Sequence, residues 1–272
     1  MKFALNTLGC PDWTFDQILE NAKENGINYI EIRGINGKMR ADEIEELTLE
    51  RYPAFAEKLN SYGIEIVGFG ASSSFHDPAN CEKAYKEAIE AVEICNRLGI
   101  NFVRVFGNNV PDTENESEII ERVAYHCRKL CDHALMLDSK TPVNILLEAH
   151  GDFNTHQRLF AVCSKVDRAN FGIIWDVAHT DKAYADNYIE FYRLMKPYIR
   201  HVHFKDHLRA ESGFKICSVG EGDIPLINIL ETLKKDSFSG CISLEHEKKW
   251  VPDLAEPEEE FKRFAEYIKN YK

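Results

Sequence analysis

Hydrophobic and polar residues alternate along the chain with two different periods. Helix-period stretches such as TFDQILENAKEN and NCEKAYKEAIEAVEICNRL are each followed by a short run of β-branched and aromatic residues. Three junctions, in ENGINYIEIRG, SYGIEIVGFG and RLGINFVRVFG, place a glycine between a polar helix end and the next strand. Glycine suits the left-handed cap that ends many helices. The pattern predicts helices and strands in regular alternation.

Eight strands are predicted at the intervals that repeated strand and helix units require. The candidate strands are residues 3–8, 29–33, 64–70, 102–106, 143–149, 171–176, 200–205 and 241–246. Most follow one another at about 30 to 40 residues, which leaves room for a crossover helix between parallel strands. We therefore predict an α/β fold, a (β/α)8 TIM barrel, as a single domain over residues 1–272. A doubly wound open sheet is disfavoured because no G-x-G-x-x-G follows the first strand.

The amino-acid composition limits the cellular environment and the binding partners that we expect for the protein. The chain is 44% hydrophobic, but it contains no apolar run of about 18 residues, so we expect no membrane association. Its first residues lack the features of a signal peptide, and its eight cysteines include no CxxC pair, so we expect a cytoplasmic protein with reduced thiols. The formal net charge of −12 disfavours a nucleic-acid partner. A small molecule is the expected partner, and the sequence is compatible with a homo-oligomer.

Ionisable residues stand at the carboxyl ends of the predicted strands, on the side that faces the barrel interior. In strand 143–149 the apolar residues Leu147 and Ala149 share the helix-facing side, so Glu148 and His150 point inward. The same alternation also turns inward Glu31, Arg33, Arg104, Asp176, His203, Lys205 and Glu245. A purely structural barrel fills these positions with branched apolar residues, and barrel active sites lie at the carboxyl ends of the strands. The pattern predicts an active site there.

Four of these residues suit a metal ion. Glu148, Asp176, His203 and Glu245 come from the last four predicted strands and offer three carboxylates and one imidazole. That mixture of oxygen and nitrogen donors suits one divalent ion, Mn²⁺, Mg²⁺, Co²⁺ or Zn²⁺, with positions left for water or substrate. We predict these four residues as its ligands.

The segments LLEAHGDF, GIIWDVAH, HVHFKD and ISLEHE, with VGEGDIP before the last strand, resemble the sugar isomerase and epimerase family of xylose isomerase-like TIM barrels. The resemblance implies the same four metal ligands, and a substrate contact by His179. Ketose 3-epimerases of the family carry a second glutamate six residues after the first ligand, where this chain has Asn154. The Glu-x-His arrangement of Glu148 and His150 is similar to other branches, including dehydroshikimate dehydratases, in which the corresponding histidine carries a proton.

The predicted function is a metal-dependent isomerase or epimerase of a small sugar or sugar phosphate. The proton next to a carbonyl would be transferred through an enediolate that the metal stabilises. Glu148 and Glu245 are the candidate base and acid, and His150 shares the proton transfer.

Further inward residues are candidate substrate contacts. These are His179, Lys205, Arg33 and Trp250. For Lys205 the alternative is an ion pair with Glu245 or Glu247. For Arg33 and Arg104 the alternative is neutralisation of nearby carboxylates such as Glu31. His201 is expected to form hydrogen bonds beneath the metal site.

Three alternative functions follow from the same scaffold. The first is a metal-dependent dehydratase of a polyhydroxylated ring such as dehydroshikimate or an inosose, with His150 as its base. The second, more remote, is an endonuclease IV-like nuclease, which needs extra histidines that the fourth strand, ending VFGNN, does not supply. The third is a catalytically inactive binding module, which should have lost metal ligands, whereas all four are present.

Overall fold

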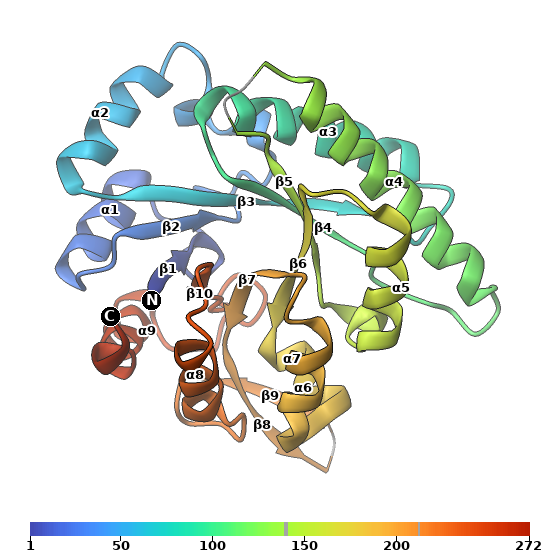
Figure 1. Ribbon diagram of the computed structural model, residues 1–272. Helices are drawn as coiled ribbons and strands as arrows, with labels where there is room; N and C mark the ends of the chain where they lie inside the picture. The colour runs from blue at the N-terminus through green and yellow to red at the C-terminus, as the bar shows by residue number, and fades with distance from the viewer. Residues whose placement is uncertain (139–140, 212) are drawn as a thin grey trace.

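The computed structural model describes residues 1–138, 141–211 and 213–272. Its eight parallel strands close into a barrel in the order β1, β10, β7, β6, β5, β4, β3, β2, as Figure 1 shows. The strands are β1 (Lys2–Asn6), β2 (Tyr29–Ile32), β3 (Glu65–Ser74), β4 (Phe102–Phe106), β5 (Asn144–Glu148), β6 (Phe171–Asp176), β7 (Ile199–Phe204) and β10 (Cys241–Leu244). Each predicted strand overlaps one of these. The predicted fold class is therefore confirmed.

Helices connect the strands and cover the outside of the barrel (Figure 1). They are α1 (Phe15–Glu24), α2 (Tyr52–Tyr62), α3 (Cys81–Leu98), α4 (Glu116–Met136), α5 (His156–Val166), α6 (Val177–Tyr184), α7 (Tyr188–Met195), α8 (Leu226–Lys235) and α9 (Pro257–Tyr267). The three junction glycines, Gly26, Gly63 and Gly99, have φ angles of 61°, 68° and 71°. They adopt the predicted left-handed conformation, which turns the chain from each helix into the next strand.

The barrel interior has two layers. An apolar layer consists of Ala4, Val67, Phe102, Leu146, Ile174 and Cys241. Above it, toward the carboxyl ends of the strands, lies a polar layer formed by Glu31, Arg104, Glu148, Asp176, His203 and Glu245, all of them buried. The larger hydrophobic cluster lies outside the strands, between the barrel and its helices. The alternation of side chains along each strand produces this separation.

Two glycines of β3 make room for large side chains inside the barrel. A Cβ atom on Gly68 would lie 2.1 Å from the Phe102 ring. A Cβ atom on Gly70 would lie 2.7 Å from both Arg104 Nη2 and Arg33 Cδ. Since such distances are far below van der Waals contact, only glycine at these positions lets the ring and the two arginines keep their places.

An antiparallel hairpin, β8 (Asp206–Ala210) and β9 (Gly213–Cys217), follows β7 at the carboxyl end of the barrel strands. This strand pair was not predicted from the sequence. The carboxylate of Asp206 anchors the base of the hairpin, accepting hydrogen bonds from the backbone N–H groups of Gly220 and Gly222 at 3.0 Å. Gly222 has no space for a side chain, because its Cβ would lie 2.1 Å from Asp206 Oδ1.

The cysteines agree with the expectation of reduced thiols. All eight cysteines are free thiols, and seven of them are buried. Among the residues that the structure describes, no helix combines the length and the apolar character needed to cross a bilayer.

Candidate functional site

The four predicted metal ligands converge at the carboxyl end of the barrel. Glu148 ends β5, Asp176 ends β6, His203 lies in β7 and Glu245 follows β10. One donor atom from each lies within 4.8 Å of the others, and all four residues are buried. Three of these donors, Glu148 Oε2, Asp176 Oδ2 and His203 Nδ1, form no hydrogen bond with the described residues, although Arg104 and Lys205 form ion pairs with the two carboxylate oxygens. A converging set of carboxylate and imidazole donors fits a divalent cation.

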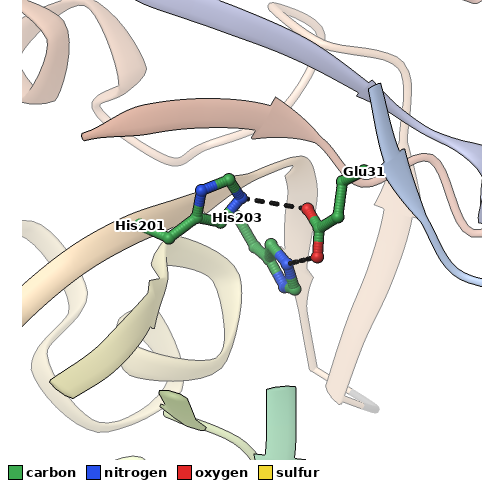
Figure 2. Close-up of side chains that lie close together, drawn as sticks. All are labelled: Glu31, His201 and His203. Carbon is green, nitrogen blue, oxygen red and sulfur yellow. Dashed lines mark hydrogen bonds and ion pairs between the residues drawn. The ribbon is translucent and has the colours of Figure 1, made fainter. Parts of the chain in front are cut away.

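His203 is oriented by a carboxylate beneath the site, as Figure 2 shows. Its Nε2 atom lies 2.9 Å from Glu31 Oε1, while Nε2 of His201 lies 3.0 Å from Glu31 Oε2. The other ring nitrogen of His203, Nδ1, therefore faces the carboxylates of Glu148 at 3.5 Å and Glu245 at 3.2 Å. A histidine that binds metal usually has such a partner on its second nitrogen, which fixes the ring. His201 occupies the supporting position that the sequence predicted.

Glu31 is hydrogen-bonded to these two imidazoles and does not pair with Arg104. Burial would raise the pKa of the Glu31 carboxyl, but His203 and His201 hold it well below its usual range. Burial also opposes charge on His203, whereas Glu245, Glu31 and Glu148 raise the pKa of its ring well above the usual value. Arg104 pairs with a nearby carboxylate, as predicted, and its partner is Glu148 at 3.1 Å, not Glu31.

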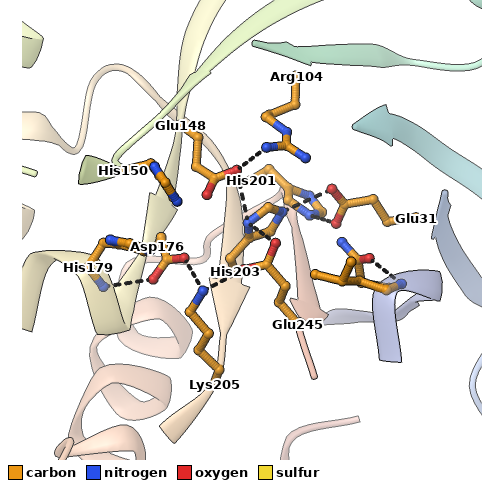
Figure 3. A network of polar contacts seen from close by, with 12 residues as sticks. Glu31, Arg104, Glu148, His150, Asp176, His179, His201, His203, Lys205 and Glu245 are labelled. Atoms are coloured by element: carbon orange, nitrogen blue, oxygen red, sulfur yellow. Dashed lines mark hydrogen bonds and ion pairs between the residues drawn. The ribbon is translucent and has the colours of Figure 1, made fainter. Parts of the chain in front are cut away.

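Lys205 and Arg104 both form ion pairs with carboxylates of the predicted ligand set (Figure 3). The Lys205 ammonium lies 2.8 Å from Asp176 Oδ2, 2.7 Å from Glu245 Oε2 and 2.6 Å from Glu247 Oε1. Burial disfavours its charge, but these carboxylates hold the pKa of Lys205 well above its usual value. Of the two roles predicted for Lys205, the structure displays the pairing with Glu245 and Glu247, and adds Asp176 as a partner.

The carboxylates of the site have different proton affinities. Burial raises the pKa of Asp176 to about 7 although Lys205 opposes the shift. Glu148 is equally buried, yet Arg104 and His203 lower the pKa of its carboxyl to about 2. Asp176 Oδ1 also accepts hydrogen bonds at 2.9 Å from the N–H groups of Ala178 and His179, which caps α6. Asp176 therefore links the ligand set to the helix that carries His179.

Two histidines lie beside the ligand set, on the wall formed by β5 and α6. The rings of His150 and His179 are 4.1 Å apart, centroid to centroid. Nδ1 of His150 lies 3.0 Å from Oδ1 of Asn108. With the Asn108 amide in this orientation, Nδ1 carries the hydrogen and Nε2 is free to accept a proton. Burial lowers the pKa of both rings, which favours their neutral form at neutral pH.

Asn108 was not singled out by sequence reasoning. It follows β4 and has a φ angle of 69°, a left-handed conformation that asparagine adopts more readily than most residues. An asparagine just beyond a strand end is the only signal that the sequence offers. Asn154, which stands where ketose 3-epimerases have a glutamate, donates a hydrogen bond of 3.1 Å to the backbone oxygen of His179.

A cavity of about 260 Å³ opens above the ligand set. Its walls include every predicted substrate contact and every predicted catalytic residue: Arg33, Glu148, His150, His179, Lys205, Glu245 and Trp250. Trp250 is 56% exposed and lies at the mouth. The hairpin contributes Phe214 and Ile216 to the same walls, a contribution that sequence reasoning missed together with the hairpin itself.

The sequence pattern of the xylose isomerase-like TIM barrel family matches residues 19–271. The chain therefore belongs to this family. An uncharacterized protein of Methanocaldococcus jannaschii is 25% identical over 222 residues, which cover 78% of this chain and 74% of the relative.

Solved structures share the fold over nearly the whole chain. A probable 3-DHS dehydratase, AsbF, from Bacillus anthracis has 19% identity and a TM-score of 0.76, with 100% of both chains covered. A D-psicose 3-epimerase from Clostridium cellulolyticum H10 has 17% identity and a TM-score of 0.76, covering 100% of this chain and 99% of its own. The IOLI protein with a bound zinc atom has 21% identity and a TM-score of 0.75, covering 99% and 97%.

Proposed function

We propose that the protein is a divalent-metal-dependent isomerase or epimerase of a small sugar or sugar phosphate. The observation that carries the proposal is the convergence of three carboxylates and one imidazole within 4.8 Å, at the floor of a cavity on the catalytic side of the barrel. The family includes sugar epimerases, such as the D-psicose 3-epimerase of similar fold. An inactive binding module would not need to keep this buried and electrostatically costly set intact.

The ligand set would hold one ion through Glu148, Asp176, Glu245 and Nδ1 of His203. Mn²⁺, Mg²⁺, Co²⁺ and Zn²⁺ all suit these donors, and the similar IOLI structure binds zinc. Bound there, the ion would supply positive charge to a substrate carbonyl and so make the neighbouring carbon more acidic. Glu31 would keep Nδ1 of His203 turned toward the ion by accepting the hydrogen of Nε2.

Proton transfer falls to groups that border the cavity. Glu148 ends β5, Glu245 follows β10, and both are ionised, so each could exchange a proton with a substrate carbon in the cavity. His150 presents Nε2 as a neutral base, while Asn108 fixes the ring. In an epimerase, one of these groups removes the α-proton and another returns a proton to the opposite face.

The second candidate is a dehydratase of a polyhydroxylated ring, such as dehydroshikimate or an inosose. Two observations favour it: His150 stands directly beside the ligand Glu148, and Asn154 bonds to the backbone instead of facing a substrate. The probable 3-DHS dehydratase has the same fold over its full length. Here His150 would remove the proton, and a hydroxyl group would leave from the adjacent carbon.

A substrate screen in D₂O separates the two candidates. The metal-loaded protein is incubated with ketoses, ketose phosphates, inososes and dehydroshikimate and followed by NMR. An isomerase or epimerase incorporates deuterium next to the carbonyl, whereas a dehydratase produces an alkene. A protein that binds a divalent ion stoichiometrically and changes none of these compounds would contradict both proposals.

A further inference from the structure

Arg33 differs from the other buried cations of the cavity. Arg104 pairs with Glu148, and Lys205 pairs with three carboxylates. Arg33 is only 8% exposed, yet it forms no ion pair with any carboxylate among the residues that the structure describes. Its Nη2 donates a hydrogen bond of 3.1 Å to Ser72 Oγ, and its buried Nη1 atom has no hydrogen-bond partner there.

The surroundings hold Arg33 in place. Its backbone N–H donates to Thr7 Oγ1 at 2.8 Å, and the Thr7 hydroxyl in turn donates to the Gly34 carbonyl at 2.6 Å. The side chain lies against Gly70, where a Cβ atom would be 2.7 Å from Arg33 Cδ. The guanidinium is therefore a positioned group on the cavity wall and not a flexible surface side chain.

A buried and unpaired guanidinium is unfavourable by itself. Transfer of a charge out of water costs free energy unless an opposite charge compensates for it. Burial and the neighbouring Arg104 lower the pKa of Arg33 to about 10, which still leaves the group protonated at neutral pH. The charge thus persists in the cavity wall. The planar guanidinium matches the paired oxygens of a carboxylate or a phosphate.

We propose that the substrate carries an anionic group, a carboxylate or a phosphate, that binds Arg33 while its reacting carbons face Glu148 and Glu245. This inference rests on the proposed function and narrows its substrate class. It excludes neutral ketoses and inososes. It retains two kinds of compound from the screen, the ketose phosphates and the ring acids.

Calorimetric titration of the metal-free protein tests the anion site separately from catalysis. The probes are inorganic phosphate and shikimate, a ring carboxylate. We expect one of them to bind the wild-type protein, and to bind Arg33→Met roughly 10- to 100-fold more weakly, the loss expected for hydrogen bonds to a charged group. Arg193→Met, on the exposed surface of α7, is the matched control and should bind like the wild type. Arg33→Lys, which keeps the charge but loses the planar group, should fall between.

The outcomes are distinct. Binding of phosphate alone indicates a sugar phosphate, and binding of shikimate alone indicates a ring acid. If neither probe binds, or if Arg33→Met binds as well as Arg193→Met, the anion site is refuted. Turnover of neutral ketoses with equal KM in wild type and Arg33→Met refutes the substrate class but leaves the proposed function standing. Probe binding that depends on Arg33, without turnover of any compound in the screen, refutes the proposed function and leaves the anion site standing.

Discussion

The apolar and polar layers inside the barrel come from the same strands and are both buried, but burial has opposite effects on their contributions to stability. On β5, Leu146 belongs to the apolar layer, and Glu148, two residues later, belongs to the polar layer. On β6 the corresponding pair is Ile174 and Asp176. Removal of an apolar side chain from water stabilises the fold, whereas removal of a carboxylate destabilises it unless partners compensate. Burial alone therefore does not tell a structural position from a chemical one.

The polar layer is compensated only in part by its own members. Lys205 and Arg104 pair with carboxylates, and His201 and His203 are hydrogen-bonded to Glu31. Glu148 Oε2 and Asp176 Oδ2 are thus held by ion pairs alone, and Nδ1 of His203 has no hydrogen-bond partner in the described part of the chain. The apolar layer has no such open positions. We expect substitutions in the polar layer to affect ion binding and turnover, and substitutions in the apolar layer to affect stability.

The largest effect is expected for Glu148→Ala. The substitution removes one of the four predicted ligands and one negative charge, so metal affinity and activity should be lost together. The measurement is metal content by mass spectrometry after dialysis, alongside kcat for whichever substrate the screen identifies. Crystals grown with Mn²⁺ should show an anomalous peak between the four ligands in the wild type. Full metal content in Glu148→Ala would remove this residue from the ligand set.

His150→Ala should separate proton transfer from metal binding. His150 borders the cavity next to a ligand, but its Nδ1 bonds to Asn108 and not to the ligand set. We expect the metal to stay and kcat to fall by roughly 10² to 10⁴, the usual contribution of a general acid or base. Metal loss as severe as in Glu148→Ala would make His150 a ligand or its support. Unchanged kcat would make it structural and deprive the dehydratase proposal of its base.

Phe102→Ala probes the apolar layer. The ring fills the space that Gly68 leaves open and packs against His201 with ring centroids 4.8 Å apart. Its removal should lower the free energy of unfolding by roughly 3 to 5 kcal/mol, the cost of a large cavity in a core. Urea unfolding measures this, and metal affinity of the folded fraction should change little. Strong loss of affinity would show that the two layers are coupled through His201.

The smallest expected effect is a pH dependence of the free energy of unfolding that arises from the ionisation of Asp176. Its pKa in the folded protein, about 7, lies above the value of about 3.9 in an unfolded chain. The folded state therefore binds the proton more tightly, and this contribution to stability is complete below pH 4 and is lost as the pH rises through 7.

Asp176→Asn isolates the contribution of Asp176 ionisation to stability, because asparagine keeps the helix cap and does not titrate. In metal-free protein, the free energy of unfolding of the wild type should fall relative to Asp176→Asn by roughly 2 kcal/mol between pH 5 and pH 8. Urea titrations at the two pH values measure the difference. Parallel curves for the two proteins would mean that Asp176 is already ionised at pH 5.

The sequence predicted those features that depend on one strand at a time. Alternation along β5 predicted that Glu148 points inward and Leu147 outward, and the junction glycines predicted where helices end. The contacts between strands could not be predicted in this way. Glu31 and His201 are separated by 170 residues, and only closure of the barrel brings them together.

The hairpin of β8 and β9 shows a second limit of prediction from the sequence. Its strands pair only with each other and are largely exposed, so they lack the apolar alternation that marks a strand on a core. Lys205 shows a third limit. From the sequence alone, a lysine that points into a site could bind a substrate anion or pair with nearby carboxylates, and only the distances in the structure distinguish the two. The predicted ligand set needed no such distances, because four carboxyl ends of neighbouring barrel strands meet by construction.

Closure of the barrel depends on the pairing of β1 with β10, the first strand and the last (Figure 1). Glu245 directly follows β10, so a ribosome-bound chain that has not yet emerged past this residue holds at most three of the four ligands. Strand β1 cannot pair with its second neighbour, β10, until almost the entire chain has been synthesised. Metal binding by the four predicted ligands would thus require complete synthesis, because products truncated before Glu245 lack one of the four residues.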